Sequence, residues 1–313
     1  MNAIKPPRLK KGDLIGLVSP AGTPLPTEKI DGAVRYLESL GYRTVVGANA
    51  AKVHGYLAGT DQERAADLNV FIKDERIKAI FALRGGYGTP RILSLVDYRS
   101  LKKKPKIISG FSDITGLQLA VYKKCNLVTF SGPMPAVEFW KNPDAYTEEH
   151  FWRLVTSKQK AGFLPNPAGE PVQILKSGKT AGVLLGGNLA LVTAAVGTAF
   201  LPSMRNVLLV LEEVEEQPYR VDRMFAQLNN AGILMGIKGL VLGKFTNCVP
   251  KDPEKPSLST EQVLADYATA VKGPVVANFQ YGHIAKKLTV PFGVRARLDA
   301  AKGTLEVLES AVQ

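Results

Sequence analysis

The chain has 313 residues, of which 45% are hydrophobic and 22% are charged. This length leaves room for two domains with separate cores, and the composition is that of an ordinary soluble globular protein. No run of apolar residues approaches the ~18 that a membrane-spanning helix requires, so we expect no membrane partner. Residues 1–13 contain basic side chains but neither an apolar signal core nor a cleavage site, so we expect a cytoplasmic protein.

The chain is basic. It has 40 Lys and Arg residues against 28 Asp and Glu, which gives a net charge of +12. The basic residues are scattered, and the densest group, at 102–106, has no interleaved aromatic residues and no recognition motif. We therefore expect a solvated basic surface and no nucleic-acid partner, although the charge can help to attract an anionic small substrate.

The two cysteines, Cys125 and Cys248, are far apart in the sequence and belong to no Cys/His cluster. They predict two buried, reduced thiols rather than a disulfide framework. No ligand pair has the spacing that zinc requires, so we expect no metal site.

Strand-like and helix-like segments alternate through the first half of the chain. Apolar runs that end in turns predict strands, and apolar residues at helical spacing predict helices. The expected strands are 14–18, 43–46, 78–83 and 106–109, and the helices between them begin after Thr27, after Thr60 and at Pro90. This alternation predicts an α/β fold with a doubly wound parallel sheet.

The pattern weakens over residues 142–170, where Pro, Gly and polar residues increase, and we place a linker there. Beyond it, strand-like and helix-like runs follow one another less regularly. The expected strands are 182–185, 207–211, 240–242 and 275–278, and the expected helices are 189–195, 220–230 and 260–271. The second half is therefore expected to be a smaller domain of mixed topology.

Reactive groups of a parallel sheet belong at the carboxyl ends of its strands. Ser112, in the stretch SGFSDITG at 109–116, lies where an expected strand turns into a helical pattern. Such a serine has an exposed hydroxyl near the positive end of a helix dipole, and the N–H of the next residue can help to bind an oxyanion. However, Ile114 replaces the second glycine of the usual G-x-S-x-G motif. The residues themselves leave two readings open: Ser112 reacts, or Ser112 or Asp113 caps the helix.

A glycine-rich turn, Arg84–Gly88, follows another apolar strand. Its backbone N–H groups can approach a ligand closely, but such turns are also common as purely structural features.

A nucleophilic serine needs a base, and the chain has only three histidines. We expect His54 and His150 to be surface residues, because both lie in polar stretches. His283 follows the apolar run 275–279 in a strand-end loop, which is a better place for a working imidazole, although a satisfied structural histidine also fits. A base needs an orienting carboxylate, and the apolar strand 208–211 runs directly into Glu212 and Glu213.

Taken together, these segments resemble the LD-carboxypeptidases, serine peptidases also called muramoyltetrapeptide carboxypeptidases. The resemblance covers nearly the whole chain, through seven segments in the same order. They are KKGDLIGLVSPAG at 10–22, LAGTDQERAADLN at 57–69, ALRGGYGTPRIL at 82–93, SGFSDITGLQLA at 109–120, GVLLGGNLALVTAAVGT at 182–198, LEEVEEQPYRVDRM at 211–224 and YGHIAKKLTVPFG at 281–293.

The resemblance implies a Ser112 nucleophile, a His283 base and a Glu212 carboxylate that orients the histidine. Glu213 stands where the family often has Asp, so the choice of Glu212 depends on a one-residue alignment. The implied oxyanion hole uses the backbone N–H groups of Gly86 and Asp113. Candidate substrate-binding residues lie in the same glycine turn: Arg84, Gly85 and Tyr87.

The resemblance also implies a fold. An N-terminal flavodoxin-like domain, related to class I glutamine amidotransferases, carries the nucleophile over residues 1–165. A C-terminal β-rich domain carries the glutamate and the histidine over residues 166–313. Members are commonly homodimers, so a homodimer is expected.

The implied reaction is hydrolysis of the L,D-amide bond that releases terminal D-alanine from murein tetrapeptides, through an acyl-enzyme and without a cofactor. A second branch of the family cleaves aminoacyl- or peptidyl-nucleotide conjugates and confers immunity to microcin C. That branch has a longer insertion with an aromatic residue near the acidic motif, whereas residues 212–219 here are compact and lack Trp. Ser131 also departs from the family, where many members have histidine.

Overall fold

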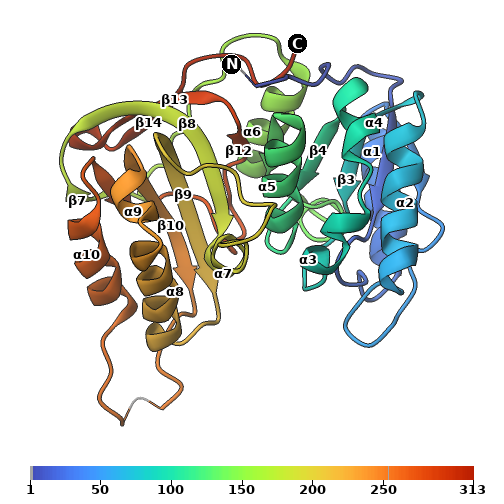
Figure 1. Ribbon diagram of the computed structural model, residues 1–313. Coiled ribbons are helices and arrows are strands. Elements are labelled where there is room, and N and C mark those ends of the chain that lie inside the picture. Colours follow the sequence, from blue (N-terminus) through green and yellow to red (C-terminus); the bar gives the residue numbers. More distant parts are fainter. Residues whose placement is uncertain (1–2, 253) are drawn as a thin grey trace.

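Two β-sheets lie side by side in the computed structural model, which describes residues 3–252 and 254–313 (Figure 1). The first sheet has the strand order β12-β5-β4-β3-β1-β2. Its strands are β1 (Leu14–Val18), β2 (Arg43–Val46), β3 (Ile77–Ala82), β4 (Ile107–Gly110), β5 (Thr129–Ser131) and β12 (Val290–Phe292). Strands β1 to β5 are parallel in the flavodoxin-like order 2-1-3-4-5, and only β12 runs antiparallel, against β5.

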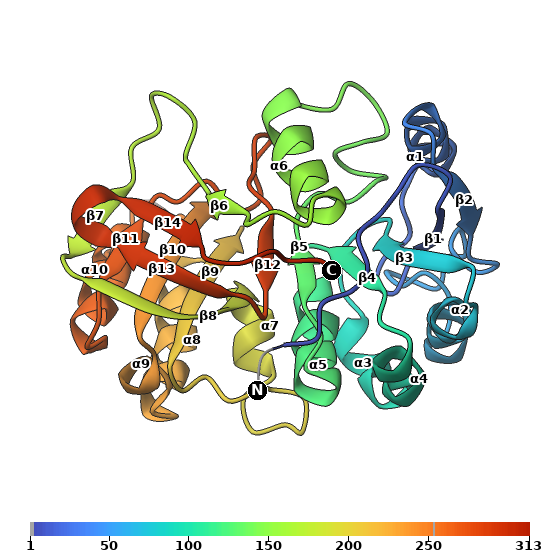
Figure 2. The same cartoon turned by 90° about the horizontal axis from the view of Figure 1, so that it is seen from above.

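Helices cover both faces of this sheet, as the successive β-α-β crossovers require. In the view from above, α1 (Glu28–Ser39) and α6 (Ala145–Thr156) lie on one face (Figure 2). The opposite face carries α2 (Asp61–Lys73), α3 (Thr89–Ile92), α4 (Tyr98–Lys103) and α5 (Ile114–Cys125). The strands are almost continuously buried, as expected for a parallel sheet covered on both sides.

The second sheet has the order β6-β14-β13-β8-β9-β10-β11-β7. Its strands are β6 (Gly162–Phe163), β7 (Gln173–Lys176), β8 (Lys179–Asn188), β9 (Val207–Val214), β10 (Gly239–Thr246), β11 (Val275–Ala277), β13 (Arg295–Asp299) and β14 (Thr304–Val307). Strands β8 to β11 form a parallel core, and the outer strands pair antiparallel. The expected fold class, a flavodoxin-like sheet followed by a β-rich mixed half, is confirmed.

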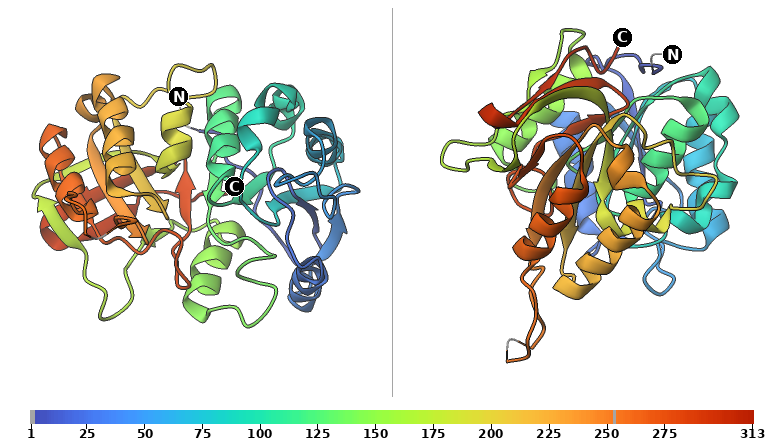
Figure 3. Two further views of the ribbon diagram at one scale, coloured as in Figure 1. Left: turned by 90° about the horizontal axis from the view of Figure 1, so that it is seen from below. Right: turned by 60° about the vertical axis from the view of Figure 1, so that its left-hand side comes forward.

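The helices of the second half are α7 (Leu189–Ala194), α8 (Pro218–Asn230), α9 (Ile233–Gly236) and α10 (Thr260–Ala270). Seen from below, they lie on the same side of the molecule as α2 to α5, and α5 packs beside α7 at the junction of the halves (Figure 3). The chain at 290–294 also joins the sheets, because β12 pairs with β5 while Gly293 and Val294 exchange backbone hydrogen bonds with Leu184 of β8. The junction therefore fixes the two sets of strand ends relative to each other.

The stretch expected to be a linker holds regular structure. Asp144 caps α6, and the buried residues of this helix recur at helical spacing, at positions 147, 150, 151, 154 and 155. The expectation that His150 lies on the surface is wrong, because it belongs to this buried face. The domain boundary at residue 165 stays a prediction, and β6 and β12 each belong to the sheet of the other half.

The expected strands and helices outside that stretch are present. Most ends shift by one or two residues, but β8, β9 and β10 extend three or four residues beyond the expected runs. Cys125 and Cys248 are free and buried, as expected. Among the described helices, none combines the length and apolar character needed to cross a bilayer.

Candidate active site

Ser112 lies on the sharp connection between β4 and α5. Its φ of 62° falls in the left-handed region that residues other than glycine rarely adopt. Asp113 occupies the position that precedes the helix, but its side chain makes no capping hydrogen bond to α5. The side chain of Ser112 is directed to a histidine instead, so the capping alternative does not describe this turn.

His283 lies between Ser112 and Glu212 in an unbroken series of hydrogen bonds. Its Nε2 is 3.0 Å from Ser112 Oγ, and its Nδ1 is 2.7 Å from Glu212 Oε2. The imidazole packs on the ring of Phe111, with the ring centroids 4.8 Å apart. The structure thus brings together three residues that are up to 171 positions apart in the chain.

Glu212 and Glu213 are neighbours at the end of β9, but their carboxylates have different main partners. Glu212 is fully buried and faces His283. The Glu213 carboxylate accepts hydrogen bonds from Asn188 Nδ2 at 2.7 Å and from the N–H groups of Ala190 and Val214. Burial raises the pKa of Glu213. The geometry thus separates the two carboxylates: only Glu212 contacts the histidine.

Asn188 is a site residue that sequence reasoning missed. Its Nδ2 also donates to Glu212 Oε1 at 3.3 Å, and its Oδ1 accepts from Leu191 N as the cap of α7. Its backbone N–H donates to Thr115 Oγ1, on the first turn of the helix that follows Ser112. The available signal was an asparagine between an apolar strand and a helix, which by itself predicts only a cap.

The glycine turn lies directly against the serine. A Cβ added to Gly85 would be 2.9 Å from Ser112 Cβ and 3.2 Å from Ser112 Oγ. Gly86 has φ 107°, and Gly22 N donates to the carbonyl of Gly85 at 3.0 Å. In the described ranges, neither the Gly86 N–H nor the Asp113 N–H donates a hydrogen bond to a protein atom. Their role as an oxyanion hole stays a prediction.

The two candidate substrate-binding side chains of this turn are accessible. Arg84 is exposed, and its Nη1 donates to the carbonyl of Thr23 at 2.9 Å, with no ion pair in the described part of the chain. Tyr87 is half exposed and packs edge-on against the exposed ring of Tyr56, with the centroids 5.6 Å apart. Contacts of Arg84, Gly85 and Tyr87 with a substrate stay predictions.

The other sequence candidates lie apart from this arrangement. His54 is exposed, and His150 Nδ1 contacts the carbonyl of Tyr146 in its own helix. Ser131 is buried and lies 2.7 Å from the hydroxyl of Tyr281, whose pKa burial raises. Among the described residues, no three His, Cys, Asp or Glu side chains gather as metal ligands would.

Family models cover most of the chain. The model of the LD-carboxypeptidase N-terminal domain matches residues 15–132, and that of the LD-carboxypeptidase C-terminal domain matches residues 181–298. The chain belongs to the LD-carboxypeptidase family. It is therefore an enzyme of this family, and the expected resemblance is confirmed.

Relatives of two kinds are similar over nearly their full length. A probable murein peptide carboxypeptidase of Bacillus subtilis is 40% identical, over 98% of this chain and 95% of that protein. A solved muramoyltetrapeptide carboxypeptidase of Oxalobacter formigenes is 31% identical, with a TM-score of 0.81 over 94% of this chain and 97% of that one. The structure of MccF in complex with glutamyl sulfamoyl guanosine has a TM-score of 0.89 at 26% identity, over 99% of both chains.

Proposed function

We propose that this LD-carboxypeptidase is a serine peptidase that releases terminal D-alanine from murein tetrapeptides. The series Ser112–His283–Glu212, at 3.0 and 2.7 Å, is the observation that carries the proposal. It has the order of nucleophile, base and orienting carboxylate that acyl transfer requires.

In the proposed reaction, Ser112 Oγ attacks the carbonyl carbon of the penultimate residue while His283 Nε2 accepts the hydroxyl proton. The tetrahedral intermediate collapses, the C–N bond breaks, and His283 returns the proton to the leaving amine of D-alanine. A water molecule, deprotonated by the same imidazole, then hydrolyses the acyl-enzyme and regenerates Ser112. Glu212 keeps the Nδ1 proton in place and stabilises the positive imidazole.

The negative charge on the carbonyl oxygen needs donors that are already in position. The backbone N–H groups of Gly86 and Asp113 are the proposed pair. Two observations support them: neither N–H has a protein acceptor in the described residues, and Gly85 lies against the serine. The carbonyl must therefore enter between the glycine turn and the start of α5.

A carboxypeptidase must also recognise the free carboxylate of its substrate. Arg84 is exposed at the glycine turn, and among the described residues only the carbonyl of Thr23 contacts its guanidinium, through Nη1. We assign it the terminal carboxylate, because a guanidinium can form paired hydrogen bonds with one. Tyr87 would then contact the neighbouring part of the peptide. We further propose a homodimer that acts in the cytoplasm, which sedimentation and cell fractionation test.

The deciding experiment is D-alanine release from a murein tetrapeptide by the wild type and by Ser112→Ala. We expect release by the wild type in the presence of EDTA, since the proposed route uses only side chains and water. The variant should lose all but a residual ~10³-fold acceleration over the uncatalysed reaction. A variant that keeps the wild-type rate would eliminate Ser112 as nucleophile.

The alternative function is cleavage of an aminoacyl- or peptidyl-nucleotide conjugate, and the TM-score of 0.89 with MccF supports it. The connection between β9 and α8 argues against it, because only residues 215–217 separate these elements and none is aromatic. An aminoacyl sulfamoyl adenosine, tested beside the tetrapeptide, separates the two functions. A higher kcat/KM for the nucleotide conjugate would favour the alternative.

A further inference from the structure

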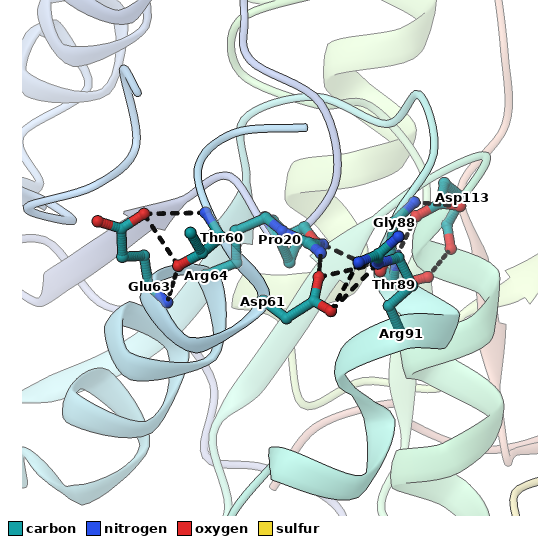
Figure 4. Close-up of polar contacts among 9 residues, drawn as sticks. All are labelled: Pro20, Thr60, Asp61, Glu63, Arg64, Gly88, Thr89, Arg91 and Asp113. Atoms are coloured by element: carbon teal, nitrogen blue, oxygen red, sulfur yellow. Dashed lines mark hydrogen bonds and ion pairs between the residues drawn. The ribbon is translucent and has the colours of Figure 1, made fainter. Parts of the chain in front are cut away.

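A buried arginine on α2, Arg64, has no part in the mechanism above. It is 1% exposed and is among the largest fully buried side chains of the described residues. A buried guanidinium is costly unless its donors are paired. Nη1 donates to the backbone carbonyls of Pro20, at 2.5 Å, and Gly88, at 2.9 Å, and Nη2 pairs with Asp61 (Figure 4).

Gly88, the last residue of the glycine turn, is held from two sides. Arg64 binds its carbonyl, and the Asp113 carboxylate accepts from its N–H at 3.2 Å and from the N–H of Thr89 at 2.7 Å (Figure 4). The hydroxyl of Thr89 donates in return to the carbonyl of Asp113. Gly88 has φ 141°, and a Cβ there would lie 2.5 Å from Arg64 Nη1, so the contact requires glycine.

These bonds connect three loops at the carboxyl edge of the first sheet. Pro20 follows β1, Gly88 follows β3, and Asp113 comes directly after Ser112. Asp113 is fully buried, and burial raises its pKa, while the two N–H donors and the charge of Arg64 act in the opposite direction. The Arg64 guanidinium and the Asp113 carboxylate, which carry opposite charges, therefore bind the carbonyl and the N–H of the same residue, Gly88.

We propose that Arg64 is a positioning residue for the oxyanion hole. Through Gly88 and Asp113 it holds the glycine turn so that the N–H groups of Gly86 and Asp113 face the same point beside the Ser112 hydroxyl. This inference rests on the serine mechanism proposed above. Because the donors matter most when charge develops on the substrate oxygen, loss of Arg64 lowers kcat and leaves KM nearly unchanged.

The test compares Arg64→Met with Arg91→Met. Arg91 is a matched control, because its exposed guanidinium binds the same Asp61, at 2.9 Å, and is replaced by the same side chain. We expect Arg64→Met to lose ~10–100-fold in kcat with KM within about twofold, since displaced donors cost less than deleted ones. Arg91→Met should match the wild type. Arg64→Lys, which keeps a buried donor, should fall between them.

A second readout does not depend on the natural substrate. A fluorophosphonate reacts as Ser112 Oγ bonds to phosphorus, its proton passes to His283 Nε2 and fluoride leaves, with the phosphoryl oxygen in the proposed oxyanion hole. We expect Arg64→Met to be labelled ~10–100-fold more slowly than the wild type. Leu68→Ala, in the buried face of the same helix, should lower the unfolding temperature without slowing the labelling.

Labelling of Arg64→Met at the wild-type rate would overturn the proposal, as would an equal slowing in Leu68→Ala, which would indicate general loosening of α2. If the wild type is labelled but releases no D-alanine, the proposed substrate is wrong, and the labelling rates still decide the role of Arg64. If Arg64→Met does not fold, Arg64→Lys decides: a slower rate supports the proposal and an unchanged rate rejects it.

Discussion

Replacing Glu212 by glutamine should give His283 the wrong tautomer, because the surroundings fix the orientation of the new amide. Asn188 Nδ2 donates to Glu212 Oε1 at 3.3 Å, and the Asn188 side chain cannot turn over without losing its bonds to Glu213 and Leu191. The amide oxygen of the introduced glutamine must therefore face Asn188, and its NH₂ group must face His283 Nδ1. That nitrogen then becomes an acceptor, and Nε2 carries the proton toward Ser112, where a base is needed.

The size of the effect follows from the charge and from the tautomer. At an effective dielectric constant of about 20, two unit charges about 4 Å apart attract by about 4 kcal/mol. Glu212 is 0% exposed, so water does not replace the lost carboxylate beside the positive imidazole. Because each 1.36 kcal/mol is a factor of ten, the charge alone accounts for about 10³-fold in kcat. The wrong tautomer brings the expected loss to ~10⁴-fold, as in other serine triads.

Two measurements test this prediction. D-alanine release gives kcat, with Glu216→Gln as the control, since Glu216 pairs with Arg220 in the same segment. The ¹⁵N shifts of His283 report the tautomer, and with only three histidines in the chain its signals can be assigned by substitution. A loss of less than tenfold, or an unchanged Nδ1–H tautomer in Glu212→Gln, would refute the reasoning.

Three further predictions concern packing and protonation. Gly85→Ala should lower kcat at least about tenfold, since its Cβ would lie 2.9 Å from Ser112 Cβ; an unchanged rate of D-alanine release would contradict this. Burial raises the pKa of Cys125 and Cys248 to about 11, so DTNB should label neither thiol in the native protein at about pH 8 and both after denaturation; rapid native labelling would contradict it. Burial lowers the pKa of Lys106 to about 8, against ~10.4 in the unfolded chain, so the native state loses this proton at lower pH than the unfolded state. The free energy of unfolding should therefore rise between about pH 8 and ~10.4. Urea unfolding should show a gain of about 3 kcal/mol across that window that Lys106→Met lacks; parallel pH profiles would reject it.

The sequence was most informative where burial and periodicity coincide. Most of the parallel strands are apolar runs, so their positions were predicted closely, whereas the short parallel strand β5 was not predicted. Helix α6 was missed although its buried positions recur at helical spacing after Asp144. The surrounding sequence is rich in Pro, Gly and polar residues, which favoured a linker over a helix. Because the helix was not predicted, the burial of His150 was not predicted either.

The candidate site could be predicted only in part, because its members come from separate strand ends. Ser112, Glu212 and His283 were found one at a time by residue type and position, and their distances depend on how the two sheets pack. Asn188 and Arg64 carry no such signal. The sequence around Asn188 predicts only a helix cap, and Arg64 resembles a charged residue on the exposed face of a helix. Their burial beside the site follows only from the tertiary structure.

The turn at Ser112 lacks the second glycine of the usual motif, and its packing explains why Ile114 is tolerated. A Cβ on Gly110 would lie 2.7 Å from the side chain of Ile114 and 3.0 Å from Ala82 Cβ, so Ile114 fills the space that the bare glycine leaves. The space beside Ser112 comes instead from Gly85, on the turn that follows the neighbouring strand. The residue that must lack a side chain is therefore Gly85 in the adjacent turn, and not the residue at position 114 in the helix. In the proposed mechanism the same turn provides both room for the serine and a backbone N–H for the oxyanion, so we expect its anchoring through Gly88 to affect the rate of the reaction.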